Sequence, residues 1–234
     1  MDYQSTIQFR VENEELHGVF FSKDNIRPSV FLMHGGGVLS SNERTLYLSN
    51  RLLAKDIPTF AFDFSGHGKS TGDLKESSLK KRQNEAINAI CHADISKPLT
   101  IVGASMSGYT AIKLIEDFDI KNLILFCPAV YDEKAYKIKF NEGFTEIIRK
   151  KESWRNSDAF STLNKFSGNL LIIIGEDDQV IPEGVIDLID QYSSRAKKKE
   201  IIKIPNCNHL IHNWFNNHPE DADRITQKIA DFIK

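Results

Sequence analysis

The chain has 234 residues and a mass of 26.6 kDa, which is enough for one large domain with a sizeable core. Apolar residues make up 41% and charged residues 26% of the sequence, a balance that excludes a disordered or fibrous chain. The 30 basic and 32 acidic residues give a net charge of -2, which argues against a nucleic-acid partner. The 3 cysteines are scattered and form no C-x-x-C pair, so they argue against a disulfide framework and fit a reducing compartment.

No run of the sequence approaches the ~20 apolar residues that a membrane-spanning helix needs. The richest apolar runs, such as residues 170–174, have the length of a strand. A secretory signal begins with a cationic stretch that is followed by an apolar one. Residues 1–5 do not start such a pattern. We therefore expect no membrane partner and a cytoplasmic location.

Short apolar runs alternate with helical patterns along the chain. The predicted strands, in chain order, cover residues 6–11, 18–22, 30–33, 59–62, 99–102, 123–127, 170–174 and 200–204, the first two as a hairpin. The predicted helices cover residues 46–53, 79–93, 106–118, 185–192 and 221–233. Continuous apolar strands that alternate with helices are typical of a parallel sheet covered on both faces. The sequence predicts a single α/β domain over residues 1–234, with a doubly wound, mostly parallel sheet of about eight strands.

Residues 131–168 interrupt this alternation, because they separate two strands by far more than a usual crossover loop. Six large apolar side chains lie there among many charges: Phe140, Phe144, Ile147, Ile148, Trp154 and Phe160. We predict that this segment is a short helical insertion that lies over one end of the sheet as a lid. Its slight basic excess could favour an anionic substrate, but it is also typical of a solvated face.

The strongest chemical signal is the segment Gly103–Gly108, where a short strand meets a helix and Ser105 occupies the sharp turn between them. A nucleophile on such a turn needs small neighbours, because larger side chains would collide with the strand and the helix. The turn also leaves the backbone N–H of Met106 at a helix N-terminus, where it can bind an oxyanion. In the pattern G-x-S-x-G the last glycine is replaced by Ser107, so an alternative is an ordinary helix start with Ser105 as its cap.

A serine hydroxyl is a poor nucleophile unless a base accepts its proton and an acid orients that base. Acidic residues follow the predicted strand 170–174, and His209 follows the last predicted strand. The carboxyl ends of parallel strands meet at one edge of the sheet, so we expect these groups to gather near Ser105. The chain order Ser105, Asp178, His209 is a serine, acid, histidine order.

The chain resembles a serine hydrolase of the α/β-hydrolase superfamily, of the carboxylesterase type, over nearly its whole length. The landmarks that carry the resemblance are His34–Gly37, Asp63–Ser70, the serine turn, Gly175–Asp178 and Asn208-His209. The resemblance implies a catalytic triad and an oxyanion hole with these members: Ser105 as nucleophile, His209 as base, Asp178 as acid, and the N–H groups of Gly36 and Met106 as oxyanion donors.

Other acids and histidines compete for these roles. Asp177 is the alternative acid beside Asp178, and Asp132 occupies a rarer acid position of the family. His212 and His218 are alternatives to His209, and we expect His212 at the surface or facing the lid. The pair His209-x-x-His212 is not accompanied by H-E-x-x-H or a cysteine cluster, so no metal ion is predicted.

Residues 66–70 invite comparison with phosphate-binding loops, but they fit neither the Walker nor the dinucleotide pattern. The sequence therefore predicts no cofactor, and the family resemblance makes this stretch a structural loop beside the active site. The expected activity is hydrolysis of small soluble carboxylic esters through an acyl-enzyme. A thioesterase or small peptidase would use the same triad, and a non-catalytic binding module with this fold is the alternative of another class.

Overall fold

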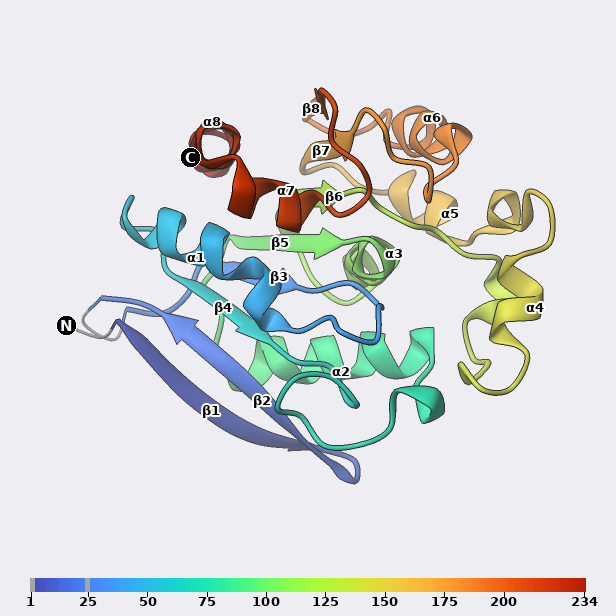
Figure 1. The fold of residues 1–234 in the computed structure, drawn as a ribbon, viewed down its shortest axis with the longest axis horizontal. Helices are drawn as coiled ribbons and strands as arrows, with labels where there is room; N and C mark the ends of the chain where they lie inside the picture. The colour runs from blue at the N-terminus through green and yellow to red at the C-terminus, as the bar shows by residue number, and fades with distance from the viewer. Residues whose placement is uncertain (1–2, 24–25) are drawn as a thin grey trace.

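The computed structural model describes residues 3–23 and 26–234, and its strands form one eight-stranded sheet (Figure 1). The strands are β1 (Gln4–Val11), β2 (Glu14–Phe21), β3 (Val30–Met33), β4 (Thr59–Phe62), β5 (Leu99–Ala104), β6 (Ile120–Phe126), β7 (Asn169–Gly175) and β8 (Lys198–Ile204). Their order in the sheet is β1-β2-β4-β3-β5-β6-β7-β8. β1 pairs antiparallel with β2, and β2 with β4, whereas all other neighbours are parallel. The predicted doubly wound, mostly parallel sheet is confirmed.

Helices connect the parallel strands. The α-helices are α1 (Leu46–Leu53), α2 (Leu79–His92), α3 (Met106–Lys113), α4 (Phe144–Ile148), α5 (Ala159–Leu163), α6 (Glu183–Tyr192), α7 (Ile211–Asn217) and α8 (Pro219–Ile233). Short 3₁₀ helices are η1 (Asn42–Thr45), η2 (Leu74–Glu76), η3 (Leu114–Glu116), η4 (Glu133–Ala135) and η5 (Ser153–Asn156). None of the helices in the described part of the chain combines the length and the apolar character of a membrane span.

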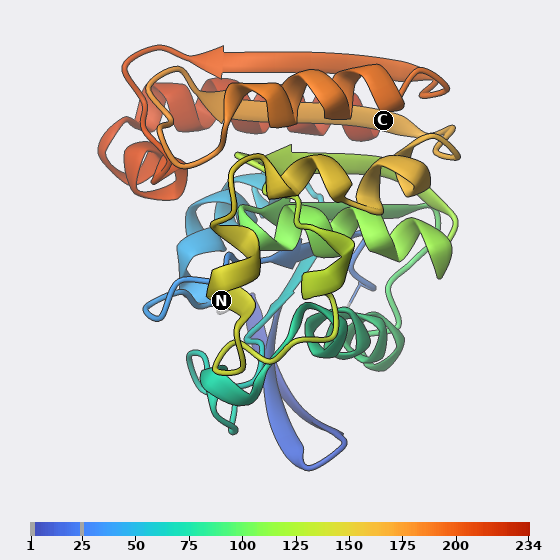
Figure 2. The same ribbon diagram turned by 90° about the vertical axis from the view of Figure 1, so that its right-hand side faces the viewer.

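The sheet is the middle layer of three. Helices α1, α7 and α8 cover one face, and α2, α3, α5 and α6 cover the other (Figures 1 and 2). Neighbouring residues of β5 show why both faces are apolar: Ile101 packs into the cluster beneath α2 and α3, and Val102 packs into the cluster beneath α1 and α8. Side chains alternate between the faces of a strand, so a strand buried on both sides must be apolar at every position.

The sequence misplaced some element ends. A single helix was expected over 106–118, but α3 ends at Lys113 and the chain continues as η3. The sixth strand was expected to include Cys127, which instead follows β6 in a left-handed conformation with φ of 42°. Helix α7 was not predicted, because seven largely polar residues are too few to show a helical period.

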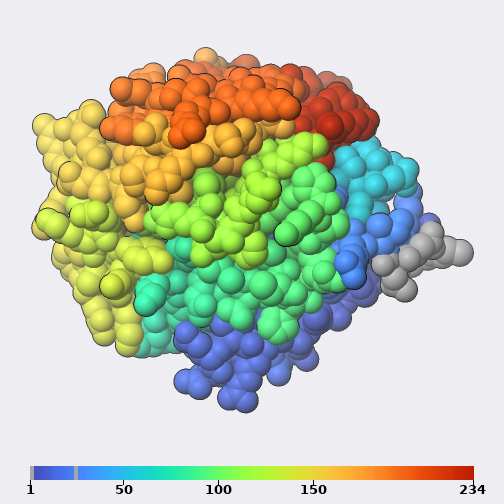
Figure 3. Space-filling view, turned by 180° about the vertical axis from the view of Figure 1, so that it is seen from behind, coloured from blue at the N-terminus to red at the C-terminus, as the bar shows by residue number. Residues whose placement is uncertain are grey.

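The insertion at 131–168 contains η4, α4, η5 and α5, and it is coloured yellow-green to yellow in Figures 1 and 3. It extends past the carboxyl end of β5 and forms one end of the molecule (Figure 1). The N–H of Phe140 donates to the carbonyl of Ser77 at 2.9 Å, and the Tyr109 hydroxyl donates to Asp158 at 2.7 Å. The insertion is thus attached both to the segment before α2 and to α3.

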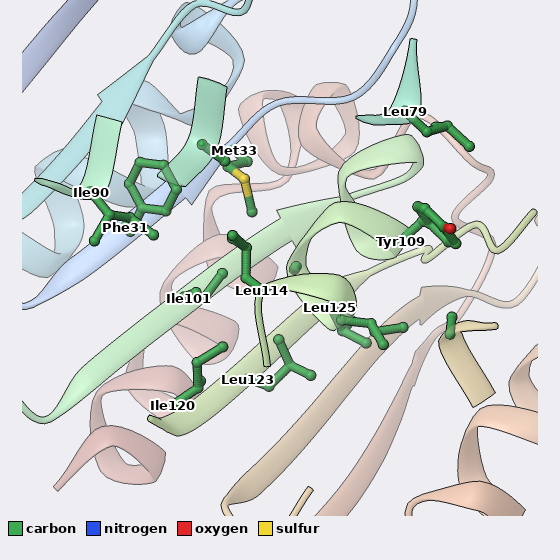
Figure 4. Close-up of a cluster of buried hydrophobic side chains, with 14 of the residues drawn as sticks. Phe31, Met33, Leu79, Ile90, Ile101, Tyr109, Leu114, Ile120, Leu123 and Leu125 are labelled. Carbon is green, nitrogen blue, oxygen red and sulfur yellow. The ribbon is translucent and has the colours of Figure 1, made fainter. Parts of the chain in front are cut away.

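Core packing is expected to dominate the stability of this fold. Leu125 on β6 is fully buried in the cluster drawn in Figure 4, whereas the Leu39 side chain is 85% exposed. We expect Leu125→Ala to lower the free energy of unfolding by about 2–5 kcal/mol, because it removes buried methyl groups and leaves a cavity. Leu39→Ala makes the same chemical change at the surface and should have almost no effect in urea unfolding. Equal losses in the two variants would contradict the assigned core.

Candidate active site

Ser105 lies at the junction of β5 and α3, in a backbone conformation that residues other than glycine rarely adopt. Its φ is 51° and its ψ is -116°. The surrounding backbone holds it there: the Ser105 N–H donates to the carbonyl of Phe126 at 2.9 Å, and the Ser105 carbonyl accepts from Gly108 at 2.8 Å and Ala129 at 3.0 Å. Such a conformation costs on the order of 1–3 kcal/mol and persists only where neighbouring structure imposes it.

Close packing explains the small residues around this turn. A Cβ atom at position 103 would lie 2.3 Å from the carbonyl oxygen of Ser107, and one at position 108 would lie 2.6 Å from the Cβ of Pro128. Both contacts are far below van der Waals distance, so Gly103 and Gly108 are sterically required. Position 107 is different, because the serine found there has polar partners of its own.

Ser107 connects the serine turn, Gly103–Gly108, to the glycine loop, His34–Gly37, which follows β3. Its hydroxyl donates to the carbonyl of His34 and accepts from the Arg82 guanidinium at 3.0 Å. Arg82 also donates to the carbonyl oxygens of His34 at 3.1 Å and Gly35 at 3.2 Å. Burial, as the largest cause, lowers the pKa of Arg82 to about 10, so this fully buried side chain remains charged at neutral pH. The departure from the G-x-S-x-G pattern is therefore filled by a specific hydrogen-bond network.

The same network sets the direction of the Gly36 N–H. The Nε2 of His34 accepts from the N–H of Phe64 at 3.2 Å, so its Nδ1 carries the proton and donates to the carbonyl of Gly35 at 2.8 Å. In a trans peptide the N–H of Gly36 points opposite to that carbonyl, away from His34 and Arg82. A Cβ on Gly36 would lie 2.5 Å from the sulfur of Met106, which shows how closely the two segments approach.

Two backbone N–H groups are available beside Ser105. That of Met106 is at the N-terminus of α3, where a helix leaves its first N–H groups unpaired. Within residues 3–23 and 26–234, neither the N–H of Met106 nor that of Gly36 donates to a protein acceptor. The two groups predicted as oxyanion donors are thus present on adjoining segments and unengaged.

The structure brings together the three side chains predicted as a triad. The Ser105 hydroxyl oxygen lies 3.0 Å from Nε2 of His209, and Nδ1 of His209 lies 2.8 Å from Oδ2 of Asp178. The His209 side chain is 16% exposed and the Asp178 side chain 6% exposed. The imidazole thus has one nitrogen on the hydroxyl and the other on the carboxylate, which is the arrangement a general base requires.

Asp178 is held as an anion. Its second oxygen, Oδ1, accepts from the N–H groups of Val180 at 2.8 Å and Ile181 at 3.1 Å. Burial alone would raise the pKa of the Asp178 carboxyl, but hydrogen bonds from His209, Ile181 and Val180 outweigh it and lower that pKa. The carboxylate is therefore ionised at neutral pH and can orient the imidazole.

Backbone contacts fix the loops that carry Asp178 and His209. The N–H of Glu176 donates to Ile204 at 3.0 Å, and the N–H of Asp177 donates to Cys207 at 2.9 Å. A Cβ on Gly175 would lie 2.3 Å from the carbonyl oxygen of Cys207. The loops after β7 and β8 therefore adjoin directly, as the parallel order of the two strands predicts.

The competing residues lie in other environments. Asp177 is exposed, and Asp132 accepts from the N–H of Lys134 at 2.9 Å as the cap of η4. His218 stacks on Trp214 with ring centroids 3.6 Å apart. Of the two positions expected for His212, the surface one is wrong, because His212 is only 8% exposed on α7, where it lines the same cavity as Tyr131 of the insertion. Its burial could not be inferred without knowing that α7 packs on the sheet.

One group of side chains could in principle bind a metal ion. Among the described residues, ligand atoms of Cys127, Asp178 and His209 lie within 4.8 Å of one another. Both nitrogens of His209 already face Ser105 and Asp178, however, and burial, as the largest cause, raises the pKa of the Cys127 thiol. A metal would need the thiolate and a free imidazole nitrogen, so these residues suit the hydrogen-bonded triad better than a metal centre.

A cavity of about 360 Å³ opens above Ser105, between the glycine loop and the start of α7. Its walls include Gly36, Met106 and His209, and also His212, which the sequence offered only as an alternative base, and Arg44, which no sequence pattern indicated. Arg44 belongs to η1, which follows the glycine loop. A single basic residue there gives no pattern in the sequence, so only the fold reveals its position.

Comparison with known proteins shows the family of this chain. The family model for the serine aminopeptidases, S33, matches residues 24–156, more than half of the chain. The chain belongs to this family. It is a hydrolase with the α/β-hydrolase fold, as the resemblance of its motifs implies.

Individual relatives of this S33-family hydrolase are distant. The uncharacterized protein YfhR of Escherichia coli K12 is 26% identical over 208 residues, which cover 86% of this chain and 69% of YfhR. Est1E of Butyrivibrio proteoclasticus, solved with bound ferulic acid, has a TM-score of 0.72 and 16% identity, with coverage of 95% of this chain and 98% of Est1E. A bacterial membrane phospholipase A has a TM-score of 0.72 and 17% identity, with coverage of 99% and 87%. The two structural likenesses show a common fold.

The burial of His212 has a consequence for stability. Burial, then the positive charge of Arg44, lowers the pKa of His212 to about 4, below its usual 6.5. The unfolded chain therefore binds a proton at higher pH than the folded protein does, so stability falls as pH decreases through about 6.5 towards 4. Acidification from about pH 7.5 to about pH 5 should therefore lower the free energy of unfolding by about 2 kcal/mol through this residue alone.

Urea unfolding of His212→Gln at the two pH values measures this contribution. The variant should lose less stability on acidification than the unmodified chain, by about 2 kcal/mol. Asn213→Gln, at the exposed neighbouring position, is the matched control and should keep the full pH dependence. If His212→Gln and the unmodified chain lose the same stability, the imidazole is not held neutral by the fold.

Proposed function

We propose that this protein is a serine esterase that cleaves small carboxylic esters through an acyl-enzyme intermediate. The observation that carries the proposal is the continuous contact from Ser105 to His209 at 3.0 Å and from His209 to Asp178 at 2.8 Å. Two unengaged N–H groups beside the hydroxyl complete the parts that acyl transfer needs.

In the proposed mechanism, the Ser105 oxygen attacks the ester carbonyl while Nε2 of His209 accepts the hydroxyl proton. The N–H groups of Gly36 and Met106 donate to the oxyanion of the tetrahedral intermediate, an effect worth about 3 kcal/mol per donor in enzymes where it has been measured. His209 then donates its proton to the leaving alcohol. Water attacks the acyl-enzyme with His209 again as base, and Asp178 stabilises the imidazolium in both steps.

The charges near Ser105 favour an ester over an aminopeptidase substrate. A free α-amino group is a cation and would need a carboxylate in the pocket to bind it. None of the residues that line the described cavity above Ser105 is acidic, and Arg44 adds a positive charge there. Asp178 is already committed to His209 and two backbone N–H groups. A thioester would meet the same groups and is distinguished from an oxygen ester by relative rates.

Active-site labelling tests the assignment of the nucleophile. A fluorophosphonate reacts covalently with a serine that is activated by a neighbouring base, so the native protein should be labelled and Ser105→Ala should not. Hydrolysis of phenyl acetate should fall to background in the same variant. Ser107→Ala, which keeps Ser105, should still be labelled. Absence of labelling in folded native protein would favour a non-catalytic binding module.

The acid can be identified by a matched pair of variants. We expect Asp178→Asn to lower kcat by about a hundredfold or more with little change in KM, because the amide cannot stabilise the imidazolium. Asp177→Asn removes a carboxylate from the exposed neighbouring position and should leave both constants within about twofold of the native values. Steady-state kinetics on phenyl acetate would contradict the assignment if the larger loss occurred at Asp177.

A further inference from the structure

Two cavities meet at Ser105, and they differ in charge. The cavity of about 360 Å³ includes Arg44 in its wall, whereas a second cavity of about 240 Å³ lies against the insertion. The second cavity is mainly apolar, with Ile148 and Trp154 from the insertion, and no charged side chain lines it in the described chain. Ser105 and Tyr131 line both cavities, so a substrate at Ser105 can extend a different group into each.

Arg44 is the only residue with a permanent charge among the described residues that line the larger cavity. Its side chain is partly buried, and no acidic side chain of residues 3–23 and 26–234 pairs with it. Arg51, by contrast, pairs with Asp223 at 2.7 Å. A guanidinium that is partly desolvated and has no carboxylate partner is suited to bind the oxyanion of a ligand.

His212 supplies a second, independent sign of a ligand at this place. Its Nε2 is buried and has no hydrogen-bond partner in the part of the chain that the structure describes, and its Nδ1 lies 3.0 Å from the hydroxyl oxygen of Tyr47. If Nδ1 carried the proton, both the Tyr47 O–H and the Nε2 lone pair would be unpaired. If the proton is on Nε2 instead, the Tyr47 hydroxyl donates to Nδ1 and only the Nε2–H is left without a partner. The tautomer with the proton on Nε2 therefore satisfies more groups. His212 lines the cavity together with Arg44, and its unused donor, which is covered from solvent, has no acceptor in the described chain.

The position of His209 tells which half of an ester the larger cavity receives. When the tetrahedral intermediate collapses, the bond between the carbonyl carbon and the leaving oxygen breaks, and that oxygen takes the proton from Nε2 of His209. The leaving group must therefore lie on the side of His209. His209 lines the larger cavity and not the apolar one.

We propose that Arg44 and His212 form a subsite for an anionic group on the alcohol half of the substrate. This inference rests on the proposed esterase function and specifies its substrate class. The substrate is an ester whose small leaving alcohol or phenol carries a carboxylate or phosphate, and whose apolar acyl group occupies the cavity beside Trp154. A cavity of about 360 Å³ limits the leaving group to a small molecule.

Matched acetate and succinate esters test the subsite. Phenyl acetate is neutral, para-acetoxybenzoate and para-acetoxyphenyl phosphate carry the charge on the leaving group, and monophenyl succinate carries it on the acyl group. We expect kcat/KM for at least one of the two leaving-group anions to exceed that for phenyl acetate by about tenfold, and the better of the two distinguishes carboxylate from phosphate. Monophenyl succinate should show no such gain.

Arg44→Gln should reduce the preference, the ratio of kcat/KM for the anionic ester to that for phenyl acetate, by about tenfold, mainly through KM. Arg44→Lys should retain part of it. Arg51→Gln removes a surface arginine of α1 and is the control that should leave the ratio unchanged. An unchanged ratio in Arg44→Gln, or a preference for monophenyl succinate, would overturn the proposal.

Binding without turnover separates failure of the subsite from failure of the esterase function. Ser105→Ala should bind para-hydroxybenzoate or phenyl phosphate more tightly than phenol in calorimetry, and the added Arg44→Gln substitution should abolish the difference. If no ester is hydrolysed but this binding and its loss are observed, the catalytic proposal fails and the anion subsite stands. If esters are hydrolysed and the anions bind no better than phenol, the subsite is wrong and the esterase function stands.

Discussion

The backbone of Ser105, with its φ of 51°, is the constraint on which the rest of the site depends. The turn carries the side chain out of β5 and places the Met106 N–H at the start of α3, so one local conformation supplies both the nucleophile and an oxyanion donor. Hydrogen bonds to Phe126, Gly108 and Ala129 hold it in place. Phe126 and Ala129 belong to β6 and the segment after it, and Gly108 belongs to α3, so the geometry of the site depends on how these elements pack together.

A buried cation strengthens this arrangement from the opposite side. Arg82 of α2 is fully buried, with its guanidinium carbon 3.6 Å from the ring centroid of Phe64. Burying a charge is costly unless hydrogen bonds replace its water. In the described chain Nε and Nη1 of Arg82 have no hydrogen-bond partner, and the replacements are the acceptors of Nη2, namely two backbone carbonyls and the Ser107 hydroxyl. All three lie at the glycine loop or the serine turn. The contacts of Nη2 thus offset part of the cost of burying Arg82, and they also fix the relative position of the two segments of the oxyanion site.

The environment of the triad divides naturally into a charged and an apolar part. The insertion supplies Trp154 and Ile148 to the apolar cavity, whereas η1 supplies Arg44 to the charged one. The insertion's own slight basic excess is not involved, because none of its lysines or arginines is among the described residues lining either cavity. Membership of the S33 family shows the fold and hydrolytic class, and the proposed choice of substrate rests on these side chains.

The sequence by itself determined the alternation of the strands with most of the helices along the chain, and the residues that could carry the chemistry. Continuous apolar strands, the small residues around Ser105, and the carboxylates and histidine after β7 and β8 are local patterns, so they can be recognised without coordinates. Only the tertiary structure decided how near these groups lie, that His212 is buried, and that Arg44 and Arg82 reach the site from η1 and α2. Burial and proximity depend on contacts between segments far apart in the chain, and such contacts leave no periodic pattern in the sequence.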